Sequence, residues 1–159
     1  MRRVAISALL FATTSACASG AGAPEPSMPP VDGETKAMDG LRYLDVSAGT
    51  GATVERNRCA YVHYTAWRSS GRQVETSRAG EPAAFVLGIG QVMRGWDIGI
   101  AGMKVGGLRR LLIPSQLAYG EKGNPPLIPP GTALVFDVEV MAVGQAIGTA
   151  ACPSYKDVR

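Results

Sequence analysis

Residues 133–143 restrict the folds open to this chain more than any other stretch. Large apolar side chains occupy every second position, and two carboxylates, Asp137 and Glu139, stand between them. Successive side chains of a β-strand point to opposite faces, so this alternation predicts a strand with one buried and one wet face. Such a strand is typical of an antiparallel sheet. The apolar residues are Leu134, Phe136, Val138 and Val140.

Other stretches predict the rest of this sheet and one helix. Helical character is confined to the residues after Arg94 and to residues 115–118. The fold class is therefore α+β: an antiparallel sheet with one helix on its apolar face. The further strands are expected at residues 41–46, on an edge of the sheet; at 59–67; at 73–77 and 84–87, as two parts of one strand joined to 59–67 by a hairpin loop; and at 108–113.

Two groups of polar residues in these strands are not expected to form a functional site. His63 is the only histidine, it lies on the strand face opposite Tyr64, and no cluster of Cys, His and carboxylates accompanies it, so neither metal binding nor catalysis is expected of it. Arg109 and Arg110 are expected at a solvated strand edge.

The stretch 88–97 contains the most informative apolar residues. Val92 and Met93 precede Trp96, the largest side chain nearby, at the start of the expected helix. Trp96 could form the floor of a pocket for a small, apolar, ring-shaped group, with Val92 and Met93 as its wall. The alternative is that Trp96 only fills a core, as buried tryptophans commonly do. The stretch by itself leaves both interpretations open.

A proline-rich loop, residues 123–131, follows Tyr119 and carries Leu127 and Ile128 at its tip. Prolines make such a loop stiff, and loops placed on a rigid sheet commonly carry function. The alternative is an ordinary surface loop.

Residues 1–18 have the features of a secretory signal peptide. Two arginines, Arg2 and Arg3, precede a short apolar run that is too short to span a membrane. Residues 16–18 form an A-x-A site, which predicts cleavage after Ala18. Residues 14–17 instead resemble a bacterial lipobox with Cys17 as the lipidated residue, although leucine is usual where Thr14 stands. Lipidation is favoured, because a lone cysteine there has no folding purpose.

The remaining chain divides into a Pro/Gly-rich linker at 19–39, one compact domain at 40–144 and a tail at 145–159. Without Arg2 and Arg3, 14 basic residues face 13 acidic ones, a net charge of +1. No cluster of basic residues with interleaved aromatics remains, so nucleic acid is not an expected partner. A monomer is expected, since no second apolar face is evident.

The order of short motifs within residues 40–144 resembles FKBP-type peptidyl-prolyl cis-trans isomerases. Each motif is weak by itself, but the ordered set is highly specific. The motifs are Val62-His63-Tyr64-Thr65, Val92-Met93-Arg94-Gly95-Trp96, Gly102-Met103-Lys104-Val105-Gly106, Ile113-Pro114, Leu117-Ala118-Tyr119-Gly120, Ile128-Pro129-Pro130 and Leu134-Val135-Phe136-Asp137-Val138.

This resemblance implies an antiparallel β half-barrel wrapped around one short α-helix, with a substrate pocket between them. It implies no cofactor and no metal. Trp96 would be the pocket floor, Tyr119 would offer its hydroxyl to a substrate carbonyl, and the backbone N–H of Met93 would be a second donor. The remaining pocket residues by position are Tyr64, Val74, Glu75, Val92, Leu127, Ile128 and Phe136, of which Tyr64, Glu75 and Phe136 join Trp96 and Tyr119 as catalytic residues.

Two positions depart from the family pattern. Val74-Glu75 stands where the family usually has Phe-Asp, and Ala83 stands where a Phe usually follows Pro82. Phe85 lies two residues beyond Ala83 on the same strand face and could compensate for the missing aromatic side chain, but the family uses that residue for packing. The pocket is therefore expected to be more open at Val74 and Ala83, and macrolide ligands are expected to bind less tightly.

Two functions are compatible with these residues. The first is an isomerase that assists the folding of exported proteins, with Pro-containing polypeptides as clients, in the periplasm and anchored to a membrane only by lipid. The second is a peptide-binding chaperone module of the same fold with little turnover, which Val74 and Ala83 favour. A scaffold for a partner, with neither activity, is a third possibility.

The family topology also suggests how the cysteines pair. If Cys17 carries lipid, Cys59 and Cys152 remain in an oxidising compartment. Cys59 begins one strand and Cys152 follows the strand that neighbours it in the family fold, so a disulfide is predicted. The bridge would tie residues 144–159 across the outside of the sheet, away from Tyr64. Two free thiols with a loose tail are the alternative.

Overall fold

A computed structural model describes residues 27–30 and 32–158 of the 159-residue chain. The expected signal peptide 1–18, with its two alternatives for Cys17 and Ala18, lies outside the described residues. None of the helices in the described ranges has the length and apolar character that crossing a membrane requires.

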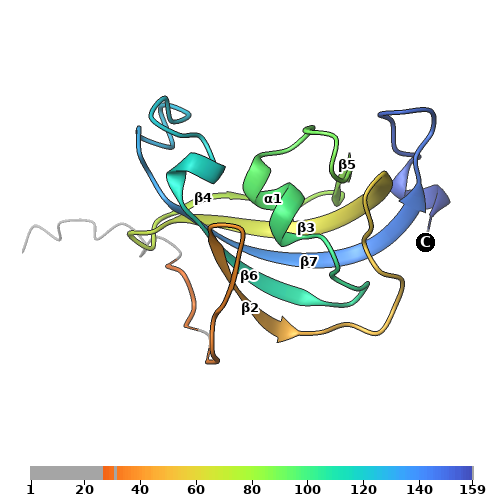
Figure 1. Ribbon diagram of the computed structural model, residues 1–159, viewed down its shortest axis with the longest axis horizontal. Helices are drawn as coiled ribbons and strands as arrows, with labels where there is room; N and C mark the ends of the chain where they lie inside the picture. Colours follow the sequence, from red (N-terminus) through yellow and green to blue (C-terminus); the bar gives the residue numbers. More distant parts are fainter. Residues whose placement is uncertain (1–26, 31, 159) are drawn as a thin grey trace, which may run out of the picture.

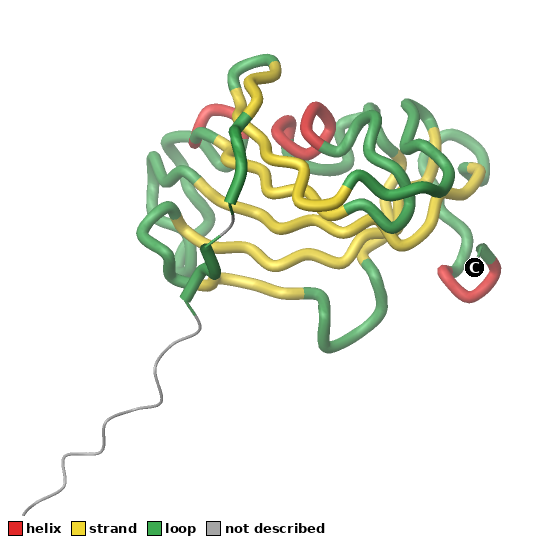
Figure 2. The backbone as a smooth tube through the Cα atoms, turned by 90° about the horizontal axis from the view of Figure 1, so that it is seen from below, coloured by secondary structure: helices red, strands yellow, loops and turns green. Residues whose placement is uncertain are grey.

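Seven strands form one open antiparallel sheet that curves around a short helix, so the α+β half-barrel class is confirmed (Figures 1 and 2). The strand order is β1-β2-β6-β7-β3-β4. The seventh strand, β5, also pairs with β3, at residues other than those that pair with β4. The elements are β1 (Lys36–Met38), β2 (Leu41–Ser47), β3 (Arg58–Arg68), β4 (Gln73–Thr76), β5 (Ala83–Val86), α1 (Arg94–Gly99), β6 (Leu108–Ile113), the 3₁₀ turn η1 (Ser115–Leu117), β7 (Leu134–Gln145) and the 3₁₀ turn η2 (Tyr155–Asp157).

The long strands β3 and β7 form the centre of the sheet. β4 pairs with residues 65–67 of β3 and β5 with residues 59–62, so the two short strands occupy one side of β3 in succession, as their sequence predicted. The four alternating apolar residues of β7 are at most 3% exposed and belong to the core under α1. They form part of the apolar core between the sheet and the helix.

Two glycines let α1 lie close to the sheet. A Cβ at Gly95 would be 2.4 Å from Cγ2 of Ile113, and one at Gly99 would be 2.7 Å from Cδ2 of Leu111. The four-residue spacing places both glycines on the same face of α1, against β6. This close approach fixes the position of Trp96, the next residue after Gly95.

The segment expected to be a linker contributes to the sheet. Lys36–Met38 forms β1, which pairs with β2 through a tight turn at Asp39 and Gly40, whose φ angles are +43° and +90°. An Asp-Gly pair with two positive φ angles is a strong hairpin signal. β2 is therefore not the edge strand that its sequence predicted, because β1 covers it on one side and β6 on the other.

Arg109 and Arg110 are buried, which corrects their expected place at a solvated strand edge. β6 is an interior strand between β2 and β7, and the two arginines are 8% and 5% exposed. Arg109 donates to the Asp45 carboxylate at 2.6 Å and to the Gly99 carbonyl at 2.8 Å. Arg110 binds both oxygens of Asp137, at 2.5 and 2.6 Å, and also donates to the Pro29 carbonyl. Each buried cation thus has a carboxylate partner on a neighbouring strand.

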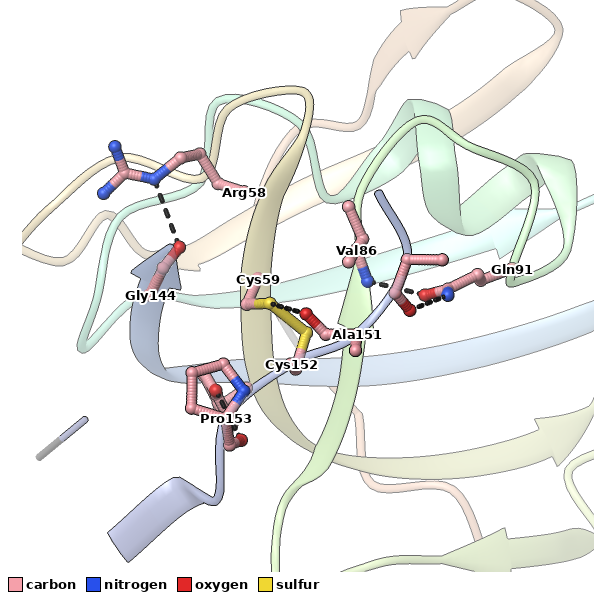
Figure 3. Close-up of a disulfide and its surroundings, with 10 residues drawn as sticks. Arg58, Cys59, Val86, Gln91, Gly144, Ala151, Cys152 and Pro153 are labelled. Atoms are coloured by element: carbon pink, nitrogen blue, oxygen red, sulfur yellow. Dashed lines mark hydrogen bonds between the residues drawn. A yellow bond between two sulfur atoms is a disulfide. The ribbon is translucent and has the colours of Figure 1, made fainter. Parts of the chain in front are cut away.

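The C-terminal tail is attached to the sheet by the predicted pair of cysteines. Cys59 and Cys152 form a disulfide with Cα atoms 5.6 Å apart, inside the range that a bridge needs (Figure 3). The Tyr61 hydroxyl donates to the Pro153 carbonyl at 2.8 Å, and its ring packs 5.7 Å from that of Tyr155. The tail therefore has its own small core on the outer face of β3.

Removing the bridge is expected to destabilise the fold. The double variant Cys59→Ala/Cys152→Ala should lose about 2–4 kcal/mol of unfolding free energy, since the bridge joins residues 93 positions apart and restricts the unfolded chain. Urea denaturation of the oxidised wild type and the variant measures the difference. The wild type in reductant should match the variant, and equal midpoints for all three samples would contradict the prediction.

Candidate substrate pocket

A cavity of about 420 Å³ opens between α1, the concave face of the sheet and the loop that follows η1. Its walls come from β3, β4, β7, the segment before α1 and that loop. The side chains are mostly aromatic or aliphatic, and Glu75 is the one charged residue among them. The lining residues are Tyr64, Ala66, Val74, Glu75, Gln91, Val92, Met93, Trp96, Ala118, Tyr119, Ile128 and Phe136.

Three aromatic rings from three elements form the floor. The Trp96 ring of α1 meets Tyr64 of β3 at 4.9 Å and Phe136 of β7 at 5.4 Å, with interplanar angles of 80° and 84°. Edge-to-face contacts of this kind are favourable because the positive edge of one ring meets the negative face of another. Trp96 is 5% exposed, so it fills the core and lines the cavity at once. The interpretation of Trp96 as a lining residue of a pocket therefore agrees with the structure, and the alternative that it only fills a core does not.

The helix and the loop before it are held together by a side chain of α1. The Asp97 carboxylate accepts from the backbone N–H groups of Gly88 and Gly90, at 2.8 and 3.2 Å. Both glycines have positive φ angles, which glycine adopts without strain. Val92 and Met93 follow this turn and line the cavity, as the sequence predicted for a wall.

Two tyrosine hydroxyls reach the cavity, and both stay protonated near neutral pH. Burial raises the pKa of Tyr64 well above its usual value, and a hydrogen bond to Glu75 and the negative charge of its carboxylate raise it further. Burial also raises the pKa of Tyr119, as does the Glu75 charge, while a hydrogen bond with Asn124 acts in the opposite direction. The Tyr119 phenol therefore remains available as a hydrogen-bond donor, whereas the Tyr64 phenol donates its hydrogen bond to the Glu75 carboxylate.

Tyr119 is positioned by a tightly bonded loop. The Gly120 N–H donates to the Ser115 carbonyl at 2.7 Å, and the Gly123 N–H donates to that of Tyr119 at 3.1 Å. Asn124 and Ile128 exchange two backbone hydrogen bonds at 2.8 and 2.9 Å. These bonds hold the far side of the cavity without regular secondary structure.

Not every residue that the resemblance implied lines the cavity. Ile128 is buried and forms part of the wall, but Leu127 is 53% exposed and stands outside it, with its carbonyl accepting from the Arg68 guanidinium. Val74 lines the cavity, whereas Ala83 borders a second hollow beside it. Phe85 does not line the main cavity: it borders the same second hollow as Ala83, and its ring packs 5.6 Å from Trp96 in the core.

Ala66, Gln91 and Ala118 line the cavity and were not identified from the sequence. Ala66 lies two residues after Tyr64 on the same strand face, so the alternation of β3 was a usable signal. No comparable signal exists for Gln91 and Ala118, because irregular loops place them.

His63 does not line the cavity. Its Nδ1 is 3.2 Å from the Ser77 hydroxyl, which accepts from the Tyr64 backbone N–H at 2.9 Å. Within the described part of the chain, no group of three or more His, Cys, Asp or Glu residues could hold a metal ion.

The geometry so far defines a protein that can enclose a small apolar ring and bind polar groups at its edge. Comparison with known proteins identifies the class. The family model for FKBP-type peptidyl-prolyl cis-trans isomerases matches residues 51–141, more than half of the chain. The chain therefore belongs to the FKBP-type peptidyl-prolyl cis-trans isomerase family.

Individual relatives agree with this assignment. An FK506-binding protein of Neisseria meningitidis serogroup B is 41% identical over 107 residues, which are 67% of this chain and 98% of that protein. The peptidyl-prolyl cis-trans isomerase FPR2 of Saccharomyces cerevisiae is 54% identical over 87 residues, 54% of this chain and 64% of the relative. A crystal structure of a peptidyl-prolyl cis-trans isomerase from Pseudomonas syringae has a TM-score of 0.64 at 35% identity, covering 70% of this chain and 81% of that one. Other relatives are much longer, and the chain spans only 22% to 29% of their length.

Proposed function

We propose that this protein catalyses cis-trans isomerisation of X-Pro bonds in polypeptides that fold outside the cytoplasm. The observation that carries the proposal is the apolar cavity of about 420 Å³ with three aromatic rings at its floor and two protonated phenols at its edge. A proline ring is small and apolar, and the carbonyls beside it need donors.

The reaction is slowed by a barrier to rotation about the X-Pro amide bond, and an apolar cavity lowers this barrier. Amide resonance maintains a rotation barrier of about 18–20 kcal/mol, and uncatalysed X-Pro isomerisation takes roughly tens to hundreds of seconds. The planar amide separates charge between N and O, whereas the twisted amide has lost that separation. An apolar environment therefore disfavours the planar ground state relative to the twisted state, which is differential binding of the transition state.

Each group of the pocket has a role in this mechanism. The rings of Trp96, Tyr64 and Phe136 supply the apolar surface, together with Val92 and Met93. The Tyr119 hydroxyl donates to a carbonyl next to the proline, and the Met93 backbone N–H is the second donor. Glu75 orients the Tyr64 hydroxyl, which fits the interaction between these side chains. None of these steps uses a nucleophile or a cofactor.

A protease-coupled assay on short X-Pro peptides tests the proposal. The wild type should accelerate isomerisation well above the uncatalysed rate, and an unchanged rate from folded protein would refute it. The second candidate, a binding module with little turnover, is favoured by the aliphatic Val74 in the cavity wall. That candidate predicts measurable peptide binding without acceleration, so a parallel binding measurement separates the two.

Tyr119→Phe should weaken catalysis while leaving the fold intact. The variant removes one hydrogen bond worth about 0.5–1.5 kcal/mol, so kcat/KM should fall by roughly 2- to 12-fold. Tyr43→Phe is the matched control, because Tyr43 lies on β2 beside Arg109 and does not line the cavity. Equal rates for both variants would remove Tyr119 from the mechanism.

Val74→Phe should increase affinity for a macrolide such as FK506. FKBP-type proteins bind macrolides of this kind, and an added aromatic wall contributes about 0.5–1.5 kcal/mol, or roughly 2- to 12-fold in Kd. Val46→Phe, an exposed position on β2 outside the cavity, is the control for nonspecific binding. An unchanged Kd in correctly folded Val74→Phe would mean that the aliphatic wall is neutral.

We also propose that the mature protein is exported and attached to a bacterial membrane through lipid on Cys17. The signal features of residues 1–18 support export, and the Cys59–Cys152 disulfide suits an oxidising compartment. Mass spectrometry of the mature N-terminus decides between the two processing sites. A lipid-modified Cys17 supports the anchor, and an unmodified N-terminus at Ser19 supports cleavage after Ala18 instead.

A further inference from the structure

Glu75 is the only charged residue among those that line the substrate cavity. It lies on β4 and is exposed, so its carboxylate is in contact with water. The other lining side chains are aromatic, aliphatic or, at Gln91, an uncharged amide. One residue therefore sets the charge of the whole cavity.

No neighbouring side chain neutralises this charge. Other carboxylates of the sheet form ion pairs with arginines: Asp45 with Arg109, Asp137 with Arg110 and Glu139 with Arg78. Within the described part of the chain, no basic side chain forms such a pair with Glu75. A cation that approached Glu75 would therefore gain Coulomb energy, and the apolar walls beside it would weaken the screening by water.

The Glu75 charge acts on both sides of the cavity. Burial is the main cause of the raised pKa of Tyr64, and the hydrogen bond from its hydroxyl to the Glu75 carboxylate raises that pKa further. Across the cavity, the pKa of Tyr119 is raised first by burial and then by the same negative charge. A polypeptide bound between the two phenols lies within range of this charge. Because a carboxylate has about four acceptor sites, Tyr64 leaves others free for a substrate.

We propose that Glu75 is a specificity-determining residue, which makes the pocket prefer clients that carry a lysine or arginine immediately before or after the proline. Both side chains have an apolar stem and a charged end, so the stem can cover an apolar wall while the charge reaches the exposed carboxylate. Consecutive Cα atoms are about 3.8 Å apart, which keeps such a neighbour beside the cavity that holds the proline ring. This inference rests on the proposed function and specifies the clients of the same pocket.

Binding of a matched peptide set to the full mature protein tests the proposal. Each peptide contains one proline flanked by alanines, and a single flanking alanine, before or after the proline, is replaced by lysine, acetyl-lysine or glutamate. Acetyl-lysine keeps the apolar stem without the charge. For at least one of the two positions, calorimetry should give a Kd for lysine that is roughly two- to fivefold lower than for acetyl-lysine, as for an exposed ion pair. Glutamate should bind most weakly.

Two variants and a change of salt assign the preference to one carboxylate. Glu75→Gln removes the charge at an exposed position but keeps an oxygen that can accept from Tyr64, so the preference for lysine over acetyl-lysine should disappear. A variant that weakened all peptides alike would leave this preference unchanged. Glu121→Gln is the matched control and should keep the preference, because Glu121 is also exposed but does not line the cavity. In about 1 M salt, where the Debye length is about 3 Å, the wild-type preference should shrink.

The outcomes separate this proposal from the proposed function. Equal binding of lysine and acetyl-lysine peptides by the wild type, or a preference that survives Glu75→Gln, overturns the role of Glu75 even if alanine peptides are isomerised normally. A preference that Glu75→Gln removes and Glu121→Gln retains supports that role even if no peptide is isomerised. Failure of every proline peptide to bind overturns both.

Discussion

Trp96→Ala should abolish peptide binding and lower the free energy of unfolding by about 3–5 kcal/mol. The side chain is 5% exposed and touches the rings of Tyr64, Phe85 and Phe136, so truncation leaves a large void in the core and removes the floor of the cavity. Urea denaturation measures the loss of stability, and calorimetric titration with an X-Pro peptide measures the loss of binding.

The chain contains a matched control for this substitution. Trp67 is 4% exposed and stacks near Arg110 on the opposite face of the sheet, away from the cavity. Trp67→Ala should cost a similar amount of stability, but the folded fraction should still bind peptide. The milder pair Trp96→Phe and Trp67→Phe gives the same comparison if either alanine variant fails to fold. Peptide binding that survives in folded Trp96 variants would show that the cavity is not the substrate site.

Asp137→Ala should destabilise the protein by about 3–5 kcal/mol, although no part of the cavity changes. The substitution leaves the Arg110 guanidinium buried without its carboxylate, and an unpaired buried charge costs far more than the pair itself contributes. Thermal or urea denaturation measures the loss, which should be seen as a lower midpoint with little change in slope.

A neighbouring ion pair supplies the comparison. Glu139 lies two residues further along β7 and pairs with Arg78 at 2.8 Å, but both side chains are at least one-third exposed. Glu139→Ala should therefore cost only about 0–1 kcal/mol. The double variant Arg110→Met/Asp137→Leu should recover most of the stability that Asp137→Ala loses. A loss from Asp137→Ala no larger than that from Glu139→Ala would show that Arg110 is adequately solvated.

The sequence predicted the positions of the strands more accurately than the environments of their side chains. The alternating burial predicted for β7 and the bounds predicted for β6 were correct, because adjacent residues of a strand face opposite sides of the sheet and their polarity shows which side is buried. β1 was missed although the Asp39-Gly40 turn signalled it, since the proline-rich composition before it suggested a linker. The environment of Arg109 and Arg110 could not be predicted, because their partners lie 64 and 27 residues away and become known only from strand register.

The pocket shows the same division. Trp96, Tyr64, Phe136 and Tyr119 were expected to line it because they stand within recognisable motifs, and all four do so. Leu127 belongs to an equally recognisable loop but points outward. The direction in which a loop side chain points depends on contacts of the whole loop, such as the bond from Arg68 to the Leu127 carbonyl, and motif spacing does not contain that information.

By itself, the sequence determined an antiparallel α+β sheet with one helix, the family and the residues at the pocket floor. The sheet and helix follow from the periodicity of neighbouring residues, and the family and the pocket residues follow from the resemblance that the order of the motifs carries. Only the tertiary structure decided which charges are buried, which loop side chains line the cavity and how the C-terminal tail packs on the outer face of β3. A cavity forms where side chains from segments distant in sequence leave space between them. A buried charge is tolerated only where a distant segment supplies an oppositely charged partner. Both outcomes are set by the packing of the whole chain.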